Sequence, residues 1–114
     1  MATLYVRRVN LKESLSDAEV VDYWRFLMEE VIPAILKVPG IRSIKSYSGA
    51  GALRADLRIA IEMDDAGAYE RMLVDANMRP LIAKITAAWD LNTASQSFFR
   101  EITPELIQAL SSTD

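Results

Sequence analysis

The sequence predicts an α+β domain in which two helices cover one face of a four-stranded antiparallel sheet. Two observations lead to this prediction. Residues 57–63 alternate apolar and polar side chains, which is the period of a strand with one buried face. Apolar side chains recur at helical spacing in residues 20–35 and 69–89. The order of segments is strand, helix, strand, strand, helix, strand, and right-handed crossovers then place both helices on one side of the sheet.

Length and composition indicate one domain. The chain has 114 residues, and 51% of them are hydrophobic, which is enough to bury one core. We therefore expect a single domain over residues 1–114, with a short C-terminal tail helix at about 104–111. No apolar run approaches the ~18 residues of a membrane-spanning helix, and the N-terminus shows no signal-peptide pattern. We expect a cytoplasmic protein without a membrane partner.

The absence of histidine and cysteine narrows the chemistry of this chain. Without cysteine there are no disulfides, thiol nucleophiles or zinc–thiolate sites. Without histidine there is no imidazole base, no histidine-ligated haem and little prospect of a transition-metal site. The net charge is −3, with acidic and basic residues interspersed and no basic block, so nucleic acid is not an expected partner. The prediction is a protein with no cofactor and no metal.

The N-terminal half carries specific helix signals. Residues 3–10 form the first predicted strand, with large side chains on both faces. The segment Ser16-Asp-Ala-Glu19 is a capping box, so a helix begins there. Pro33 lies inside the apolar pattern of that helix. Because proline lacks a backbone N–H, the helix should kink or restart near residues 30–32, and Pro39-Gly40 should end it.

A hairpin at residues 41–63 forms the centre of the predicted fold. Its strands span residues 41–48 and 56–63, and the turn between them contains Gly49 and Gly51, which we expect to supply positive φ. Glycines of this kind also form phosphate-binding loops, but such a loop is followed by a helix, and here a strand follows. We interpret the segment as a plain turn.

The C-terminal half repeats the strand–helix–strand pattern. A second helix begins at residues 64–67, is interrupted at Asn77-Met-Arg-Pro80, and continues to about Trp89. Residues 93–102 form the last predicted strand. The tail helix places three apolar residues along one side, Leu106, Ile107 and Leu110, which must dock on their own domain or on a partner.

The ferredoxin-like sandwich defined by these elements leaves one face of the sheet uncovered within the chain. We assign to the face under the helices Leu57, Ile59, Ile61 and Met63, together with Leu4 and Val6. We assign to the uncovered face Tyr5, Arg7, Val9, Ile41, Lys45, Tyr47, Asp56, Arg58, Ala60, Glu62, Gln96, Phe98 and Arg100. A face with so many large side chains predicts a homodimer that stacks sheet on sheet about a two-fold axis.

One stretch of the sequence resembles a known superfamily. Trp24, then Pro33, then Val38-Pro-Gly-Ile-Arg-Ser43 leading into a strand is similar to the dimeric α+β barrel superfamily, which includes antibiotic biosynthesis monooxygenase-like domains, EthD-like domains and relatives of muconolactone isomerase. The Tyr23-Trp24 pair resembles EthD-like proteins in particular. Those proteins usually carry a histidine four residues after that tryptophan, and this chain has Met28 there. The resemblance implies the fold and the dimer, and it transfers no specific activity.

A small-molecule ligand between the paired sheets is the functional prediction. The ligand-binding candidates are Tyr5, Arg7, Trp24, Tyr47, Arg58 and Phe98. Arg7 or Arg58 would hold an anionic or carbonyl oxygen, and the aromatic side chains would enclose a flat ring. The alternative interpretation is that the arginines form ion pairs with Asp56 and Glu62 within the dimer interface, since buried charges must be paired.

Three functions remain open at this point, and the sequence does not decide whether the protein is an enzyme. The first is a ligand-binding protein without catalysis. The second, implied by the resemblance, is a cofactor-independent monooxygenase or isomerase acting on an aromatic or polyketide-like substrate, with Arg58 at the oxyanion, Tyr47 transferring a proton and Trp24 stacking. The third is a structural dimerisation module without a ligand.

Overall fold

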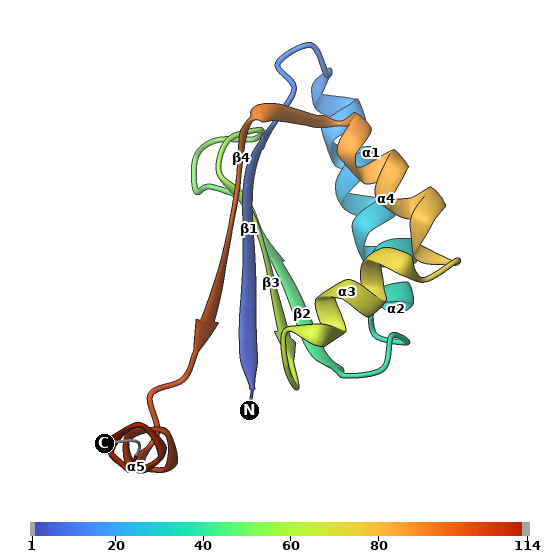
Figure 1. The fold of residues 1–114 in the computed structure, drawn as a ribbon. Coiled ribbons are helices and arrows are strands. Elements are labelled where there is room, and N and C mark those ends of the chain that lie inside the picture. The colour runs from blue at the N-terminus through green and yellow to red at the C-terminus, as the bar shows by residue number, and fades with distance from the viewer. Residues whose placement is uncertain (1, 113–114) are drawn as a thin grey trace.

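The computed structural model describes residues 2–112 and confirms the ferredoxin-like fold. Four antiparallel strands form one sheet in the order β2-β3-β1-β4. The first four α-helices lie on one face of this sheet, and the other face is bare (Figure 1). The strands are β1 Thr3–Leu11, β2 Ile41–Tyr47, β3 Leu57–Met63 and β4 Trp89–Arg100. The helices are α1 Asp17–Phe26, the π-helical turn η1 Leu27–Val31, α2 Ile32–Ile35, α3 Gly67–Val74, α4 Met78–Ala87 and α5 Pro104–Ser111.

The capping box at the start of α1 is confirmed. The backbone N–H of Glu19 donates to Ser16 Oγ at 3.2 Å, and the backbone N–H of Ser16 donates to Glu19 Oε1 at 2.9 Å. The second bond stabilises the carboxylate and holds the pKa of Glu19 below its usual value. Two of the unsatisfied donors at the helix start thus have acceptors.

The break expected near residues 30–32 is also confirmed, and it takes the form of a π-helical turn. In η1 the backbone N–H of Ile32 donates to the carbonyl of Leu27, and α2 then begins with Pro33 in its first turn. Proline has no N–H to continue the α-helical pattern. The π-helical turn places Pro33 in the first turn of a new helix. Backbone N–H groups in a first turn have no intrahelical acceptor, so the missing N–H of proline costs no hydrogen bond there.

The alternating residues of β3 face the helices, as predicted. Leu57, Ile59, Ile61 and Met63 are all buried in the core. The residues that alternate with these four lie on the uncovered face: Arg58, Ala60 and Glu62. This strand is central in the sheet, so its neighbours take their orientation from it.

The predicted faces of β1 and β4 are wrong. Tyr5, Arg7 and Val9 pair with Ile61, Ile59 and Leu57, and directly opposed residues in antiparallel strands share a face. These three residues of β1 therefore lie under the helices, and Leu4 and Val6 lie on the uncovered face. Phe98 pairs with Tyr5, Gln96 with Arg7 and Arg100 with Thr3, so these residues of β4 also belong to the helix side.

An irregularity in β2 explains one further correction. The pairing register shifts between Ile41 and Ser43, so Ile41 faces the helices like its partner Met63. Beyond the shift, Lys45 and Tyr47 lie on the uncovered face, as predicted, opposite Ala60 and Arg58.

The two glycines of the hairpin turn have different roles, and only one of them has the predicted positive φ. Gly51 has a positive φ of 78°, as predicted, whereas Gly49 does not. A Cβ on Gly49 would lie 2.8 Å from the carbonyl oxygen of Ala55, so glycine is needed there for close approach. The other positive φ in the hairpin belongs to Asp56, at 59°.

The last strand begins earlier than the sequence pattern suggested. Trp89 already pairs with Leu11 as the first residue of β4, where we expected the end of a helix. The preceding break is confirmed: α3 ends at Val74, and Asp75 Oδ1 accepts the backbone N–H groups of Asn77 and Met78 at the start of α4.

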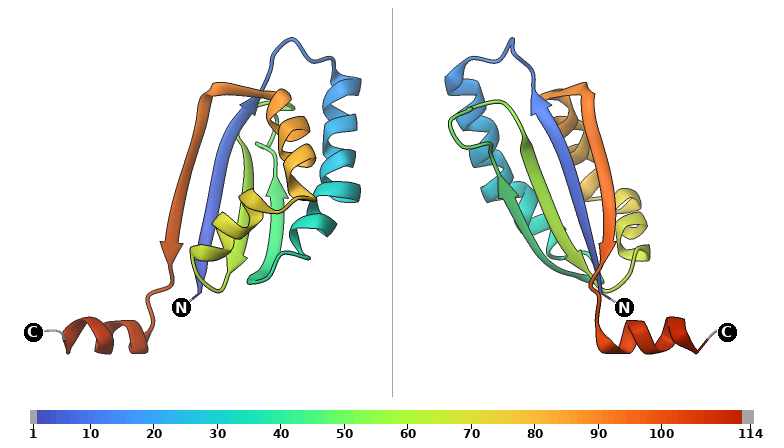
Figure 2. Two further views of the ribbon diagram at one scale, coloured as in Figure 1. Left: turned by 45° about the vertical axis from the view of Figure 1, so that its right-hand side comes forward. Right: turned by 90° about the vertical axis from the view of Figure 1, so that its left-hand side faces the viewer.

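The tail helix α5 projects beyond the end of β4, away from the sheet (Figure 2). Thr103 Oγ1 caps its start by accepting the N–H of Leu106 at 3.1 Å. Leu106 is buried, whereas Ile107 and Leu110 are more than half exposed. No helix among residues 2–112 has the length and apolar character needed to cross a bilayer.

Candidate functional site

A cavity of about 110 Å³ lies between the sheet and the helices. Its walls are mostly aliphatic side chains from all the surrounding layers: Leu27, Val31, Ile32, Ile35, Ile44, Ile59, Ile61, Met72, Leu73, Met78, Ile82 and Ile85. The polar and aromatic lining consists of Tyr5, Arg7, Ser46, Tyr69, Thr86 and Trp89. The site expected between two sheets thus has its counterpart inside one chain, on the opposite side of the sheet.

Arg7 is the charged residue of this cavity. Its Cζ lies 5.9 Å from the ring centre of Tyr5 and 5.5 Å from that of Trp89, so the guanidinium is flanked by two aromatic faces. Its Nη2 donates to Gln96 Oε1 at 2.8 Å. Its Nε is buried and has no hydrogen-bond partner in the described structure. No carboxylate among residues 2–112 lies within ion-pair distance of this guanidinium.

Three donors converge on one oxygen beside Arg7. Gln96 Oε1 accepts from Arg7 Nη2, from the Tyr5 hydroxyl at 3.1 Å and from the Tyr69 hydroxyl at 3.2 Å. The acceptor is a neutral amide, so it satisfies the hydrogen bonds without compensating the positive charge. The local charge of this end of the cavity stays positive.

An aromatic cluster borders the same end. The rings of Tyr5 and Tyr69 stack at 4.6 Å, and Phe98 lies 5.0 Å from Tyr5 and 5.4 Å from Tyr69. Burial, with the neighbouring Tyr69 hydroxyl as a smaller cause, raises the pKa of the Tyr5 phenol well above its ordinary value. The Tyr5 hydroxyl is therefore a hydrogen-bond donor at neutral pH and not a base.

The lining of the cavity contains no carboxylate and no lysine, and the chain has no histidine or cysteine. No group of three or more acidic residues that could hold a metal ion occurs among residues 2–112. The lining side chains can bind and orient an anion and can donate hydrogen bonds to it. They include no group that would accept a proton from a substrate at neutral pH.

The structure divides the predicted ligand-binding residues among three places. Tyr5 and Arg7 line the cavity, and Phe98 packs against the Tyr5 ring outside the lining. Trp24 of α1 and Tyr47 of β2 border a second hollow of about 120 Å³ at the edge of the sheet, which shares Leu27 and Ser46 with the cavity. Arg58 lies on the uncovered face beside its register partner Tyr47, and the roles expected for Arg58, Tyr47 and Trp24 between two sheets stay a prediction.

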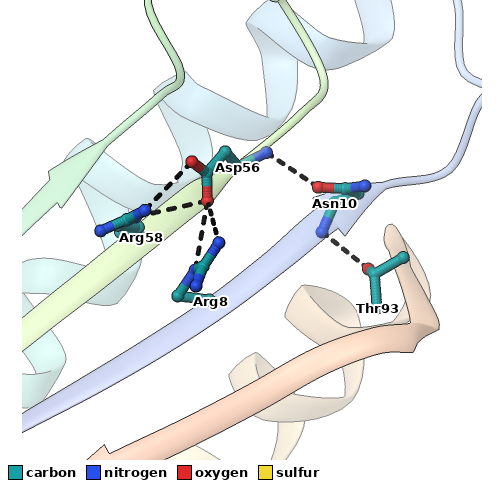
Figure 3. A network of polar contacts seen from close by, with 5 residues as sticks. All are labelled: Arg8, Asn10, Asp56, Arg58 and Thr93. Atoms are coloured by element: carbon teal, nitrogen blue, oxygen red, sulfur yellow. Dashed lines mark hydrogen bonds and ion pairs between the residues drawn. The ribbon is translucent and has the colours of Figure 1, made fainter.

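On the uncovered face, Arg58 takes part in an ion-pair network (Figure 3). Asp56 accepts from Arg58 Nη2 at 3.1 Å and from Arg8 Nε at 3.3 Å. These two arginines hold the pKa of Asp56 below its ordinary value, with the Arg58 hydrogen bond the largest cause. The backbone N–H of Asp56 donates to Asn10 Oδ1, and the backbone N–H of Asn10 donates to Thr93 Oγ1, both at 2.8 Å. The predicted pairing of Arg58 with Asp56 is thus present within one chain.

Sequence reasoning missed four residues of the cavity end. Tyr69 and Trp89 lie in the segment predicted as a helix, Gln96 was placed on the uncovered face, and Ser46 was given no role. The signal that could have found them is the cross-strand register. Once Arg7 is paired with Ile59, the same row of the sheet contains Gln96 on one side and Ser46 on the other.

The chain has a ferredoxin-like fold, and the solved structures that share it include an antibiotic biosynthesis monooxygenase and an EthD family protein. SnoaB, a cofactor-independent oxygenase from Streptomyces nogalater, is 17% identical over 90% of this chain and 97% of that chain, with a TM-score of 0.66. A dimeric ferredoxin-like protein of unknown function from Thermobifida fusca is 14% identical over 89% and 92%, with a TM-score of 0.70. An EthD family protein from Bacillus halodurans is 13% identical over 90% and 100%, with a TM-score of 0.59.

These identities establish the likeness of fold and nothing finer. No protein-family model matches the chain, and no curated protein sequence matches it. The function must therefore be argued from the cavity and its residues.

Proposed function

We propose that the protein binds a small, flat anion, an aromatic carboxylate or phenolate, in the cavity between the sheet and the helices. The observation that carries this proposal is the state of Arg7. Its Nε is buried without a partner, and no carboxylate in the described chain compensates its charge. The Arg7 side chain is partly buried, so its guanidinium has lost part of its hydration and keeps a donor group free for an anion. The protein supplies one half of an ion pair, and the ligand supplies the other.

The surroundings of Arg7 support an aromatic ring behind the anionic oxygen. The rings of Tyr5 and Trp89 flank the guanidinium, and the remaining walls are mostly aliphatic, with Ser46, Tyr69 and Thr86 as the exceptions. The cavity of about 110 Å³ is somewhat smaller than the ~150 Å³ that accommodates a benzene molecule in an engineered apolar cavity. A benzoate therefore fits only if the cavity walls move outward or the carboxylate extends beyond the cavity, and a fused polycyclic ligand is excluded.

Calorimetric titration of benzoate into wild-type protein and two arginine variants tests the proposal. Arg7→Gln removes the charge at the cavity, and Arg25→Gln removes an exposed charge on α1 as the matched control. Benzoate should bind the wild type and Arg25→Gln with equal affinity, and Arg7→Gln should bind at least about tenfold more weakly because a charge-assisted hydrogen bond is lost. Equal affinity in all three proteins would show that Arg7 does not anchor an anion.

The uncovered sheet face supports a homodimer as the functional unit. Leu4, Tyr47 and Phe99 are exposed on this face, with exposed fractions of 39%, 52% and 52%. The Thermobifida fusca protein with the same fold is described as dimeric. Stacking this face on its copy would cover these side chains and leave each cavity on the outer side of its own sheet.

A second candidate function is oxidation of the bound anion by O2 without a cofactor. It is favoured by the absence of a base from the lining, because a substrate that must arrive as its own anion is suited to direct reaction with oxygen. SnoaB, which is described as a cofactor-independent oxygenase, has the same fold. In such a step an activated methylene and one O2 give a carbonyl and one water. Oxygen uptake with a cyclic β-diketone, a flat enolate at neutral pH, tests this function, and uptake no faster than without protein contradicts it.

A further inference from the structure

A hydroxyl group without a partner lies across the cavity from Arg7. Ser46 Oγ is buried and has no hydrogen-bond partner in the described structure, and Ser46 lines the cavity. Buried polar groups in proteins are nearly always hydrogen-bonded, so an unpaired hydroxyl at a cavity wall indicates a bond that a ligand completes.

The other polar groups of the cavity already have partners within the chain. Thr86 Oγ1 donates to the carbonyl of Ile82 at 3.0 Å. The Tyr5 and Tyr69 hydroxyls both donate to Gln96, and the indole N–H of Trp89 donates to the Tyr23 hydroxyl at 2.8 Å. Among the described lining residues, the groups left for a ligand are the Arg7 guanidinium and the Ser46 hydroxyl.

The sheet register fixes the spacing of the backbone positions that carry these two groups. Arg7 pairs with Ile59 on β3, and Ile59 pairs with Ser46 on β2, so the three residues form one row across the helix-covered face. Two steps of an antiparallel ladder separate the Cα atoms of Arg7 and Ser46 by about 10 Å. The side chain between them is Ile59, which is apolar. This backbone spacing leaves room for one six-membered ring over Ile59, with an oxygen directed to each of the two side chains.

We propose that Ser46 determines ligand specificity by hydrogen-bonding a second oxygen of the ligand, para to the anionic group held by Arg7. This inference rests on the proposed function and names its ligand class: a single aromatic ring with an anionic oxygen at one end and a hydroxyl or carbonyl oxygen at the other. The ring lies over Ile59, between the two polar groups.

Two benzoates of nearly the same shape test the proposal. Para-hydroxybenzoate has the second oxygen, and para-toluate replaces it with a methyl group. Calorimetric titration should show that wild-type protein binds para-hydroxybenzoate about tenfold more tightly than para-toluate, the effect of one hydrogen bond to a buried hydroxyl. Ser46→Ala should bind the two with equal affinity. Ser43→Ala, on the uncovered face of the same strand, should keep the wild-type preference.

The outcomes separate the two proposals. If both benzoates bind wild type in an Arg7-dependent way but with equal affinity, or if Ser46→Ala keeps the preference, the role of Ser46 is wrong and the anion site stands. If meta-hydroxybenzoate is preferred over the para isomer, the row geometry is wrong. If neither benzoate binds wild type, the proposed function itself fails, and the inference fails with it.

Discussion

Removing one oxygen atom from Tyr23 should destabilise the protein strongly. The indole Nε1 of Trp89 donates to the Tyr23 hydroxyl at 2.8 Å, and both side chains are buried. Tyr23→Phe leaves the indole N–H without an acceptor in the core. Leaving a buried donor unsatisfied costs about 2 kcal/mol, which for a domain of this size lowers the melting temperature by roughly 8 °C.

Urea denaturation followed by tryptophan fluorescence measures this change. Tyr47→Phe is the matched control, because Tyr47 is half exposed and the same atom is removed from a hydroxyl in contact with water. The control should change the free energy of unfolding by less than about 0.5 kcal/mol.

A double-variant cycle identifies the cause. In a Trp89→Phe background the indole donor is absent, so Tyr23→Phe should cost much less than in the wild type. An equal cost in both backgrounds, or a cost no larger than that of Tyr47→Phe, would refute the hydrogen-bond argument. The same contact affects the site, because the Trp89 ring lies against the Arg7 guanidinium.

Three further predictions concern the helix cap, the dimer and the response to alkali. Ser16→Ala removes the side-chain acceptor of the capping box and should lower the free energy of unfolding in urea by about 1 kcal/mol; an unchanged midpoint would show that the cap contributes nothing. Leu4→Glu places a carboxylate opposite Glu62 on the uncovered face and should convert a dimer into a monomer in light scattering. The control is Leu36→Glu, at an exposed position just after α2, which should leave the dimer intact. A dimeric Leu4→Glu protein would show that this face is not the interface. Burial raises the pKa of Tyr23 to about 12, so the unfolded chain releases this proton first, and stability should fall as the pH rises from about 10 to 12, by up to about 1.4 kcal/mol per pH unit. The loss of stability over this pH range should be smaller in Tyr23→Phe. An identical pH profile for the variant and the wild type would contradict the assignment of this loss to Tyr23.

The elements that could be predicted are those with strong local signals. Ser16 and Glu19 complete each other's hydrogen bonds within one turn, so the helix start needs no tertiary information. Pro33 determines by its own covalent structure where the helix must restart. Residues 57–63 alternate cleanly because their strand is central and one of its faces is in the core.

The strand faces that could not be predicted lack such a signal. Tyr5, Arg7 and Val9 have no more apolar character than Leu4 and Val6, so the pattern within β1 cannot show which set is covered. The cross-strand register decides, and one irregularity in β2 reverses Ile41 relative to Tyr47. The candidate site depends on this register, because it brings together Gln96, Arg7 and Ser46 from three strands far apart in the sequence.

The neutrality of Gln96 leaves the charge of Arg7 without a counter-charge, as the proposed anion site requires. Its amide oxygen satisfies three donors without cancelling the charge of Arg7. A glutamate in that position has nearly the same shape, and a single base change in the gene produces it. The resulting carboxylate would form an ion pair with the Arg7 guanidinium and would compete with any anionic ligand. In this fold, the exchange of one side-chain nitrogen atom for oxygen at position 96 decides whether Arg7 has an ion-pair partner within the chain.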